Sequence, residues 1–213
     1  MIHVYYTHAG SARRSQTLER LLSELPPGLA ARAHRYRSPE AAFNFVLGRQ
    51  LLRRALTDHG FDPEMIERIR YNEHDKPLLE GCSFSISHAG YLVACAFSRT
   101  EIVGLDVEVL RELHLPDLRS WFTEPEWKDI LAAADPRRRL LVYWTKKESV
   151  LKAVGGGLSD LDAIRLLDGQ TARYETTGTI WHLRELELHK DAVATLCTEG
   201  ADPVIHLHRL DFP

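Results

Sequence analysis

The amino-acid sequence predicts an α+β fold in which two similar halves pack around a pseudo-twofold axis. Each half has a capped helix near its start and strands after it. The segment GRQLLRRAL (48–56) resembles TKKESVLKA (145–153), and VACAFS (93–98) resembles VATLCT (193–198). Chance agreement between apolar strands is the alternative explanation. If the repeat is real, a site at the junction would draw residues from both halves.

In the first half, residues 1–110, a helix is expected over 15–25, before a pair of prolines. The pair Ser38-Pro39 is typical of an N-cap followed by proline at the first helical position. A second helix should therefore start there and end at Gly60. Runs rich in apolar residues predict strands at 2–6, 66–71, 83–88, 91–97 and 102–109.

A linker between the two halves is expected over 110–116, and in the second half, residues 111–213, a helix is predicted over 124–134. The pair Asp135-Pro136 should start a longer helix, which the following glycine triplet would end. Strands are predicted at 164–167, 180–188, 193–197 and 204–210.

The composition favours a cytoplasmic protein. The net charge is −3, with 44% hydrophobic and 27% charged residues, which gives no indication of nucleic-acid or membrane binding. The three cysteines are scattered without C-x-x-C spacing, which argues against a disulfide framework or a zinc site and fits a reducing compartment. We expect no signal peptide, because no basic segment followed by an apolar stretch opens the sequence. The longest apolar run, 91–97, is too short to span a bilayer.

Two carboxylates are expected on one face of the strand GLDVEV (104–109). Side chains on a strand alternate between faces, so Asp106 and Glu108 share a face, with Cα atoms roughly 6.5–7 Å apart. Such close acids repel each other unless a cation lies between them. Hard oxygen ligands suit Mg²⁺, which keeps water ligands and recruits substrate phosphates. An ordinary strand with a solvated acidic face is the alternative.

The helix segment WTKKESVLK (144–152) places charged residues beside an apolar stripe. Trp144, Glu148 and Lys152 are spaced i, i+4, i+8 and share a face. Charges against an apolar stripe cost free energy unless something pairs with them, and a metal for Glu148 and phosphate oxygens for the lysines would do so. A surface Glu–Lys pair is the simpler alternative. The glycine triplet that follows would let a backbone approach a ligand closely.

Several cationic features could bind phosphate. Residues 32–54 hold six arginines and one acid, Glu40, although a solvated helix face is the alternative. Lys76 precedes a proline, and His88 lies at the end of a strand next to a probable turn, where an imidazole could donate to a phosphate. Because the chain has eleven histidines, an incidental His88 is the alternative.

In their order and spacing, the motifs S-x-S-H-A-G, G-L-D-V-E and W-x-x-K-E-x-x-x-K-A-x-G-x-G-L resemble the Sfp-type 4′-phosphopantetheinyl transferases. The resemblance covers roughly residues 32–160, and the last fifty or so residues carry no matching motif. It implies the fold of that family and transfer of 4′-phosphopantetheine from coenzyme A to a serine of an apo acyl or peptidyl carrier protein. The products would be the holo carrier and 3′,5′-ADP, in fatty-acid or secondary-metabolite biosynthesis. We expect a monomer.

The resemblance also implies roles for individual residues. Lys152 would contact the pyrophosphate of coenzyme A, and Glu148, or a water activated beside the metal, would take the proton of the carrier serine. The metal ligands for Mg²⁺ would be Asp106, Glu108 and Glu148. The coenzyme A contacts would be Arg49, Lys76, Ser87, His88 and Lys152.

Some matches leave roles open. Asn44 lies where relatives often have arginine, and any of Arg32, Arg35 or Arg37 could replace that contact. Glu126 matches an acid of the family's F-F/T-x-x-E segment without an assigned role. Apolar residues near Trp121-Phe122 are the predicted carrier surface.

Two rival functions are compatible with these residues. Three carboxylates and a lysine would also suit a metal-dependent phosphodiesterase or pyrophosphatase. A non-catalytic module that binds carriers or coenzyme A is the other rival, although it would have no need of clustered acids.

Overall fold

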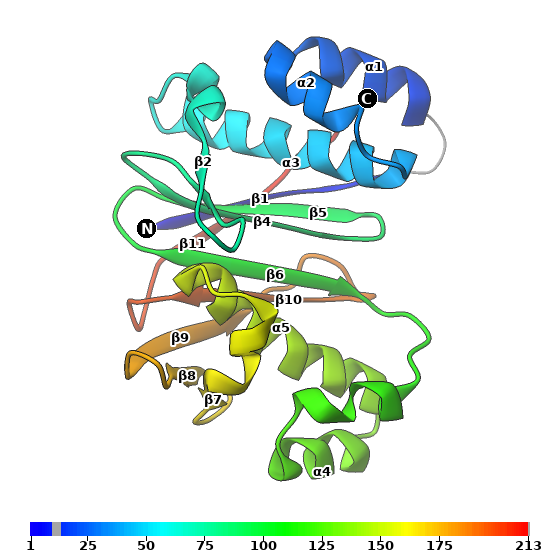
Figure 1. Cartoon of the computed structure of the whole chain (residues 1–213), viewed down its shortest axis with the longest axis vertical. Coiled ribbons are helices and arrows are strands. Elements are labelled where there is room, and N and C mark those ends of the chain that lie inside the picture. The colour runs from blue at the N-terminus through cyan, green and yellow to red at the C-terminus, as the bar shows by residue number, and fades with distance from the viewer. Residues whose placement is uncertain (10–13, 213) are drawn as a thin grey trace.

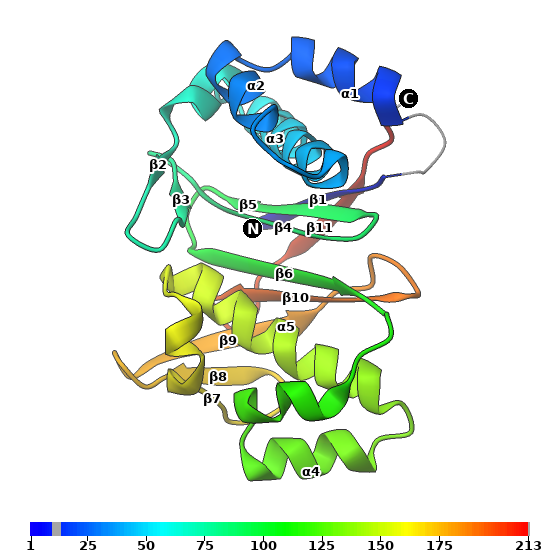
Figure 2. The ribbon, with the colours of Figure 1, turned by 45° about the vertical axis from the view of Figure 1, so that its right-hand side comes forward.

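Two β-sheets lie face to face between helices in the computed structural model, which describes residues 1–9 and 14–212 (Figures 1 and 2). The first sheet has the order β11-β1-β5-β4, and the second has the order β6-β10-β9-β8-β7. Only β1 and β11, among the pairs given for these two sheets, run parallel. The strands are β1 (Ile2–His8), β4 (Ser83–Ala89), β5 (Leu92–Ser98), β6 (Val103–Val109), β7 (Ile164–Leu166), β8 (Thr171–Tyr174), β9 (Thr179–Glu185), β10 (Ala192–Thr198) and β11 (Ile205–Arg209).

Helices cover the two outer faces of this pair of sheets (Figure 2). The first sheet is covered by α1 (Arg14–Ser23), α2 (Pro27–Ala33) and α3 (Pro39–Asp58), and the second by α5 (Pro136–Val154), against which α4 (Glu124–Ala132) packs. A small hairpin of β2 (Arg70–Tyr71) and β3 (Pro77–Leu78) lies at one side. The 3₁₀ helices are η1 (Pro63–Arg68), η2 (Leu115–Trp121) and η3 (Leu158–Ala163).

The alternation of side chains along the strands builds separate apolar layers. On β1, Val4 faces the second sheet while Tyr5 faces α3. On β6, Leu105 and Val107 point toward the first sheet, which leaves the intervening residues for the face that meets α5. The layer between the sheets contains Ile2, Val4, Leu92, Ala94, Ala96, Val103, Leu105, Val107, Ala194 and Leu196.

Serine hydroxyls join the two sheets along their facing edges, β4 and β6. Serines at alternate positions of β4 lie on one side of that strand and accept hydrogen bonds from backbone N–H groups of β6. These bonds satisfy donors that a free sheet edge would leave unpaired. The N···O distances are 3.1 Å for Val103 to Ser83, 2.9 Å for Leu105 to Ser85 and 3.2 Å for Val107 to Ser87. We call this set of contacts the serine ladder.

The α+β class predicted from the sequence is confirmed. The predicted start of α3 and the predicted end of α5 are both correct. The Ser38 side chain caps α3, and Gly155 ends α5 with a left-handed φ of 78°. The strand predicted over 66–71 is only partly correct, because residues 66–68 belong to η1 and the strand β2 is limited to Arg70–Tyr71. Asp62 caps that helix by accepting from Glu64 N, with proline in the first turn.

The sheets do not follow the order of the chain. Strand β6 precedes residue 110 yet lies in the second sheet, and β11 near the end of the chain lies in the first. The similar segments 48–56 and 145–153 lie in the helices α3 and α5, and the similar segments 93–98 and 193–198 lie in the strands β5 and β10. Both strands are fully buried, with α3 over β5 and α5 over β10. The pseudo-twofold axis and the division into 1–110 and 111–213 stay predictions.

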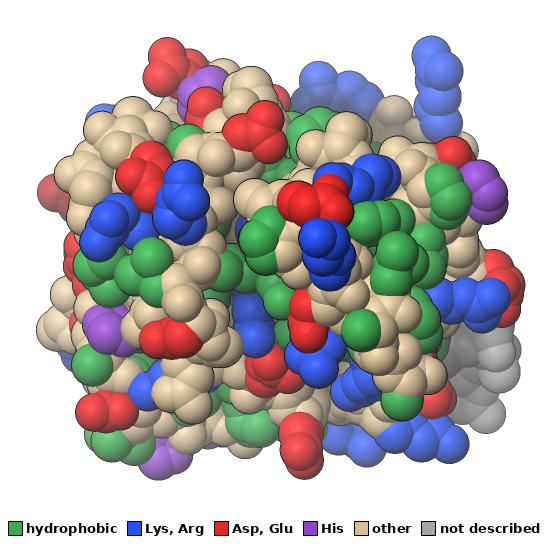
Figure 3. Space-filling view, turned by 90° about the horizontal axis from the view of Figure 1, so that it is seen from below, with side chains coloured by type: hydrophobic (Ala, Val, Ile, Leu, Met, Phe, Trp, Pro, Cys, Tyr) green, Lys and Arg blue, Asp and Glu red, His purple; other side chains and the backbone are tan. Residues whose placement is uncertain are grey.

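The surface carries both signs of charge in mixture. Seen from below, at the end of the molecule that holds α4, Lys and Arg side chains alternate with Asp and Glu side chains (Figure 3). Exposed ion pairs such as Arg139–Asp129 at 3.4 Å contribute to this mixture. Within the described ranges, no helix combines the length and apolar character that crossing a membrane requires.

Histidines from three elements gather on the first sheet beside the end of α3. The His3 ring centroid lies 4.1 Å from that of His59, 5.1 Å from that of His206 and 5.2 Å from that of His208. The His3 Nδ1 and His208 Nε2 atoms are 2.9 Å apart. Burial is the largest cause that lowers the pKa of His3, and together with the charges that His59, His208, His206 and the N-terminal amine would carry it brings this pKa to about 4.

We expect the free energy of unfolding to fall as the pH drops from about 6.5 toward about 4. In that window the unfolded chain binds a proton at His3 and the folded chain does not, so acid favours unfolding. A His3→Gln variant should show a shallower fall of Tm between about pH 7 and about pH 5. Replacing the exposed His34 by glutamine is the control and should leave the wild-type slope. If Tm fell equally steeply with pH in the wild type and in His3→Gln, protonation of His3 would not be the cause of the acid destabilisation.

Candidate functional site

A glycine on β6 lets α5 lie directly on this strand. Gly104 shares its face with Asp106 and Glu108, and a Cβ atom at Gly104 would lie 1.9 Å from Ser149 O and 2.6 Å from Ala153 N. Both are backbone atoms of α5, so a side chain at this position would displace the helix. The first residue of the G-L-D-V-E motif therefore brings α5 close enough for its side chains to meet the strand acids.

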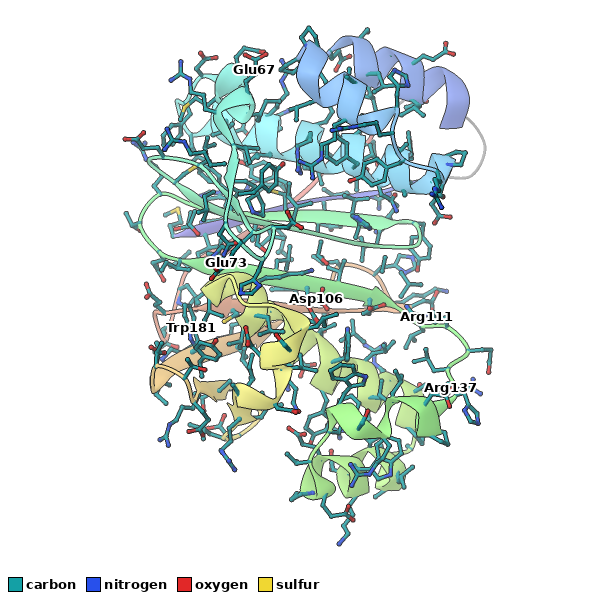
Figure 4. The ribbon with its side chains drawn as sticks, in the orientation of Figure 1. Glu67, Glu73, Asp106, Arg111, Arg137 and Trp181 are labelled. Carbon is teal, nitrogen blue, oxygen red and sulfur yellow. The ribbon has the colours of Figure 1, made fainter. Side chains whose placement is uncertain are left out.

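Asp106 and Lys152 form the centre of this contact. The Lys152 Nζ lies 2.7 Å from Asp106 Oδ1 and 2.8 Å from Ser87 Oγ, and the Ser87 hydroxyl is 2.9 Å from the same carboxylate oxygen. Asp106 is 5% exposed, and its Oδ2 atom is buried without a hydrogen-bond partner among the described residues. Figure 4 labels Asp106 near the middle of β6, where α5 passes the strand.

The two glutamates of the predicted metal set are half-buried and interact with Asp106. Burial raises the pKa of Glu148, the charge of Asp106 raises it further, Lys152 opposes this, and Glu108 adds a smaller upward effect. The side chain of Glu148 has no hydrogen bond or ion pair with any described residue. Burial also raises the pKa of Glu108, although Arg111 binds its carboxylate at 2.5 Å and opposes the shift. The three acids therefore repel one another across a small region.

The described side chains, those of residues 1–9 and 17–212, contain no group of three His, Cys, Asp or Glu residues that could hold a metal ion. The chemistry of the three acids nevertheless fits a divalent cation. Among the described residues, Asp106 offers a buried carboxylate oxygen without a partner, and Glu148 offers a half-buried carboxylate without an ion pair. Mg²⁺ prefers such oxygen ligands and would relieve the repulsion that raises the glutamate pKa values.

A pocket of about 340 Å³ opens beside these residues. It lies between the 74–77 turn, β4 and the C-terminal end of α5. Three of the predicted site residues line it, namely Lys76, Glu148 and Lys152. The other lining residues are His74, Asp75, Pro77, Phe84, Ser85, Ile86, Leu151, Gly155, Gly156, Gly157 and Leu158.

The turn before β3 docks onto the end of α5 and shapes one wall of the pocket. Asn72 Nδ2 donates to Gly155 O at 2.8 Å, and the Lys76 ammonium donates to the carbonyl of Ala153. Burial lowers the pKa of Lys76. The glycine triplet is needed here for more than one reason: Gly155 has a left-handed φ, and a Cβ atom at Gly156 would lie 2.7 Å from Asp160 Oδ2.

Two further predicted site residues are Arg49, which lies on α3, and His88, which lies on β4. Arg49 is buried, with its guanidinium carbon 4.6 Å from the Phe45 ring centroid, and it donates to the Tyr71 hydroxyl at 3.3 Å. The guanidinium of Arg32 lies 4.7 Å from the Tyr71 ring centroid, so Arg32 is a neighbour of Arg49. His88 is exposed at the end of β4. Partial desolvation lowers the pKa of His88, and the charges of Lys152 and Arg49 lower it further.

The other two lysines of the α5 motif point away from the pocket. Lys147 is 2% exposed, and its Nζ lies 2.9 Å from Glu126 Oε2 and 3.1 Å from Trp121 O. Lys146 pairs with Glu185 at 2.8 Å. Glu126 also accepts from Thr123 N at 2.8 Å and so completes the capping box of α4. This structural role of Glu126 was not predicted, although T-x-x-E before an apolar helix is its signal in the sequence.

A Lys147→Met substitution should lower the free energy of unfolding by about 3–5 kcal/mol, because it leaves the Glu126 carboxylate buried without its cation. Adding Glu126→Gln should restore a large part of that loss. Urea unfolding followed by circular dichroism would measure both changes. The matched control is Lys128→Met, which breaks an exposed pair with Glu124 and should cost less than about 1 kcal/mol. Equal effects of the two lysine substitutions would contradict the assignment of a buried pair.

Comparison with known proteins gives one consistent result. Residues 102–197 match the model of the 4′-phosphopantetheinyl transferase superfamily. The chain is 31% identical over 198 residues to 4′-phosphopantetheinyl transferase HetI of Nostoc sp. (strain PCC 7120), which covers 86% of this chain and 82% of HetI. It is 32% identical over 164 residues to 4′-phosphopantetheinyl transferase Sfp of Bacillus subtilis (strain 168), with 72% of each chain covered. It is also 32% identical over 145 residues to 4′-phosphopantetheinyl transferase AcpT of Salmonella typhi, covering 62% of this chain and 68% of AcpT. The matches to HetI and Sfp extend well beyond the residues that carry the short motifs, and this chain therefore belongs to the 4′-phosphopantetheinyl transferase family.

Proposed function

We propose that this enzyme transfers the 4′-phosphopantetheine group of coenzyme A to a serine of an apo acyl or peptidyl carrier protein. One observation carries the proposal: in a chain of this family, Glu148 and Lys152 line one pocket, and Lys152 is bonded to Asp106. Acidic groups and a lysine at one pocket suit the binding of a diphosphate and the transfer of one of its phosphoryl groups.

The bond changes follow from the chemistry of coenzyme A. The serine oxygen of the carrier forms a bond to the β-phosphorus, and the bond from that phosphorus to the bridging oxygen breaks. The leaving group is 3′,5′-ADP, and the serine proton passes to a base. Glu148 is the proposed base, because its half-buried carboxylate lines the pocket that would hold the diphosphate. Lys152 would stabilise charge on the pyrophosphate oxygens.

The remaining predicted residues would hold the substrate. Lys76 lies in the pocket wall, while Arg49 and His88 lie nearby and would meet the 3′-phosphate end of coenzyme A. Arg32, next to Arg49, is the strongest choice among the three arginines that the sequence left open. A phosphate would also lie close to the ring of His88 and would offset the neighbouring positive charges.

Asp106, Glu108 and Glu148 would hold Mg²⁺ in this proposal. When bound, Mg²⁺ neutralises charge on the diphosphate and orients it. The chain's own contribution would be to supply these carboxylates from β6 and α5, which pack against each other. Asp106 is held rigidly by Lys152 and Ser87, while Glu108 must loosen its contact with Arg111 to take part.

The carrier surface is proposed to include Trp121. This side chain is half-buried and packs edge-on against Trp144, whereas Phe122 is 4% exposed and belongs to the core. The face shown in Figure 3 carries mixed charges, so a single-sign field does not mark the carrier surface there. We expect the enzyme to act as a cytoplasmic monomer.

Incubation with coenzyme A, Mg²⁺ and a panel of apo carrier proteins tests the function, with intact-mass spectrometry as the readout. The expected result is a gain of one phosphopantetheine on at least one carrier and the release of 3′,5′-ADP. Cleavage of coenzyme A without any acceptor protein would instead identify a phosphodiesterase or pyrophosphatase. Binding without turnover, and without Mg²⁺ dependence, would identify a non-catalytic module.

A further inference from the structure

Of the three serines in the serine ladder, Ser87 is the one whose hydroxyl contacts the side chains of the candidate site. The Ser83 hydroxyl meets the backbone N–H of Val103, and the Ser85 hydroxyl meets the backbone of Leu105. The Ser87 hydroxyl meets the backbone of Val107 in the same way, but it also contacts the side chains of Asp106 and Lys152. This hydroxyl therefore connects β4, β6 and α5 at one point.

The hydrogen-bonding capacity of Ser87 is used within the protein. A hydroxyl has one donor and two acceptor positions. Ser87 Oγ donates to Asp106 Oδ1 at 2.9 Å and accepts from Lys152 Nζ at 2.8 Å and from Val107 N at 3.2 Å. The residue is 4% exposed. Its side chain has neither a free hydrogen-bonding position nor a free surface for a substrate.

These contacts fix which oxygen of Asp106 is left without a partner among the described residues. Oδ1 receives both the Ser87 hydroxyl and the Lys152 ammonium, while Oδ2 is buried and lacks a partner within the described part of the chain. Without the Ser87 hydroxyl, the carboxylate could rotate and place both oxygens on the Lys152 ammonium. The Val107 N–H would also lose its acceptor.

We infer that Ser87 is a positioning residue that orients the Asp106 carboxylate toward a divalent cation, in place of the direct coenzyme A contact that its motif suggested. The inference rests on the proposed function, since the cation site belongs to that reaction. Groups that orient the ligands of a metal typically change its affinity by about 10–100-fold when they are removed.

Two binding measurements separate the two roles of Ser87. The affinity for Mn²⁺, a spectroscopic substitute for Mg²⁺, is measured by electron paramagnetic resonance, and the affinity for coenzyme A is measured by calorimetry in EDTA. Ser87→Ala should weaken Mn²⁺ binding by about 10-fold or more and change the affinity for coenzyme A by less than about 2-fold. Ser87→Thr keeps the hydroxyl and should restore most of the Mn²⁺ affinity.

Ser83→Ala is the matched control, because it removes a ladder hydroxyl that accepts from β6 without contacting the site. It should keep the wild-type Mn²⁺ affinity and should lower the stability, because the Val103 N–H loses its acceptor. Should Ser87→Ala not fold, Ser87→Cys keeps nearly the same volume with a much weaker acceptor and carries the same expectation.

Several outcomes would overturn the inference. Weaker binding of coenzyme A in EDTA with unchanged Mn²⁺ affinity would make Ser87 a substrate contact. Failure of the wild-type enzyme to bind Mn²⁺ would leave Asp106 with no cation to face and would reject the positioning role. Failure of the carrier assay alone would reject the proposed function, while Mn²⁺ weakening in Ser87→Ala would still support the positioning role.

Discussion

A Glu148→Gln enzyme should transfer phosphopantetheine about 10³-fold more slowly than the wild type and should remain folded. Glutamine has nearly the same size as glutamate but can neither accept the serine proton nor present a charged oxygen to a cation. The fold should survive, because the side chain of Glu148 makes no ion pair or hydrogen bond with any described residue. Initial rates of holo-carrier formation, read by intact mass, would measure the loss.

The same substitution should raise the thermal stability of the metal-free protein at neutral pH. The pKa of Glu148 is raised in the folded state, first by burial and then by Asp106. A carboxylate with a raised pKa stabilises the fold at pH values below its unfolded pKa, and this contribution is lost as the pH rises through the folded pKa. Removing the charge at about pH 7 should therefore increase Tm in EDTA.

Glu187→Gln serves as the matched control for both measurements, because Glu187 is exposed on the loop after β9. Its activity and Tm should equal those of the wild type. Near-normal turnover of Glu148→Gln would exclude Glu148 both as the base and as an essential metal ligand. A lower Tm in EDTA would show that the carboxylate is stabilising and would contradict the repulsion among the three acids.

The parts of this fold that local chemistry determines could be predicted from the sequence. The Ser38 and Asp135 caps act within one helical turn, and both helices start where expected. The two-residue period of a strand placed Asp106 and Glu108 on one face of β6. The cap-and-proline signal Asp62-Pro63 was also present and would have identified η1 in place of the first part of the predicted strand.

Contacts between distant segments could not be predicted in this way. A helical wheel shows that Lys147 and Glu148 leave α5 in different directions, but it does not show which direction meets η2 and α4 and which meets the pocket. The motif therefore suggested phosphate contacts for its lysines, although the Lys147 side chain is buried against Glu126. The alternating serines of β4 were visible as a pattern, yet their acceptor role depends on β6 lying beside β4 without a backbone ladder between them.

The second large effect should follow from Gly104→Ala. The new Cβ atom would lie 1.9 Å from Ser149 O and 2.6 Å from Ala153 N, and these backbone atoms of α5 cannot rotate away. The helix must move off β6, which opens the apolar layer beneath it. We expect the free energy of unfolding to fall by about 3 kcal/mol or more, measured by urea unfolding. Transfer activity should also fall sharply, because Lys152 would lose its contact with Asp106.

Alanine substitutions at three glycines test whether the clash with the α5 backbone causes the loss of stability. The alternative is that any Gly→Ala substitution in a strand or helix of this protein is destabilising. At Gly28 in α2 a Cβ atom would meet nothing within 4 Å, so alanine should be neutral or stabilising. At Gly48 in α3 it would lie 2.8 Å from Ile86 Cγ2, a side-chain atom that can shift, so the cost should be intermediate. Only at Gly104, of these three, is the obstacle a backbone. If Gly104→Ala retained wild-type stability, α5 would not rest on β6 as described, and the placement of Glu148 and Lys152 against the strand acids would lose its structural basis.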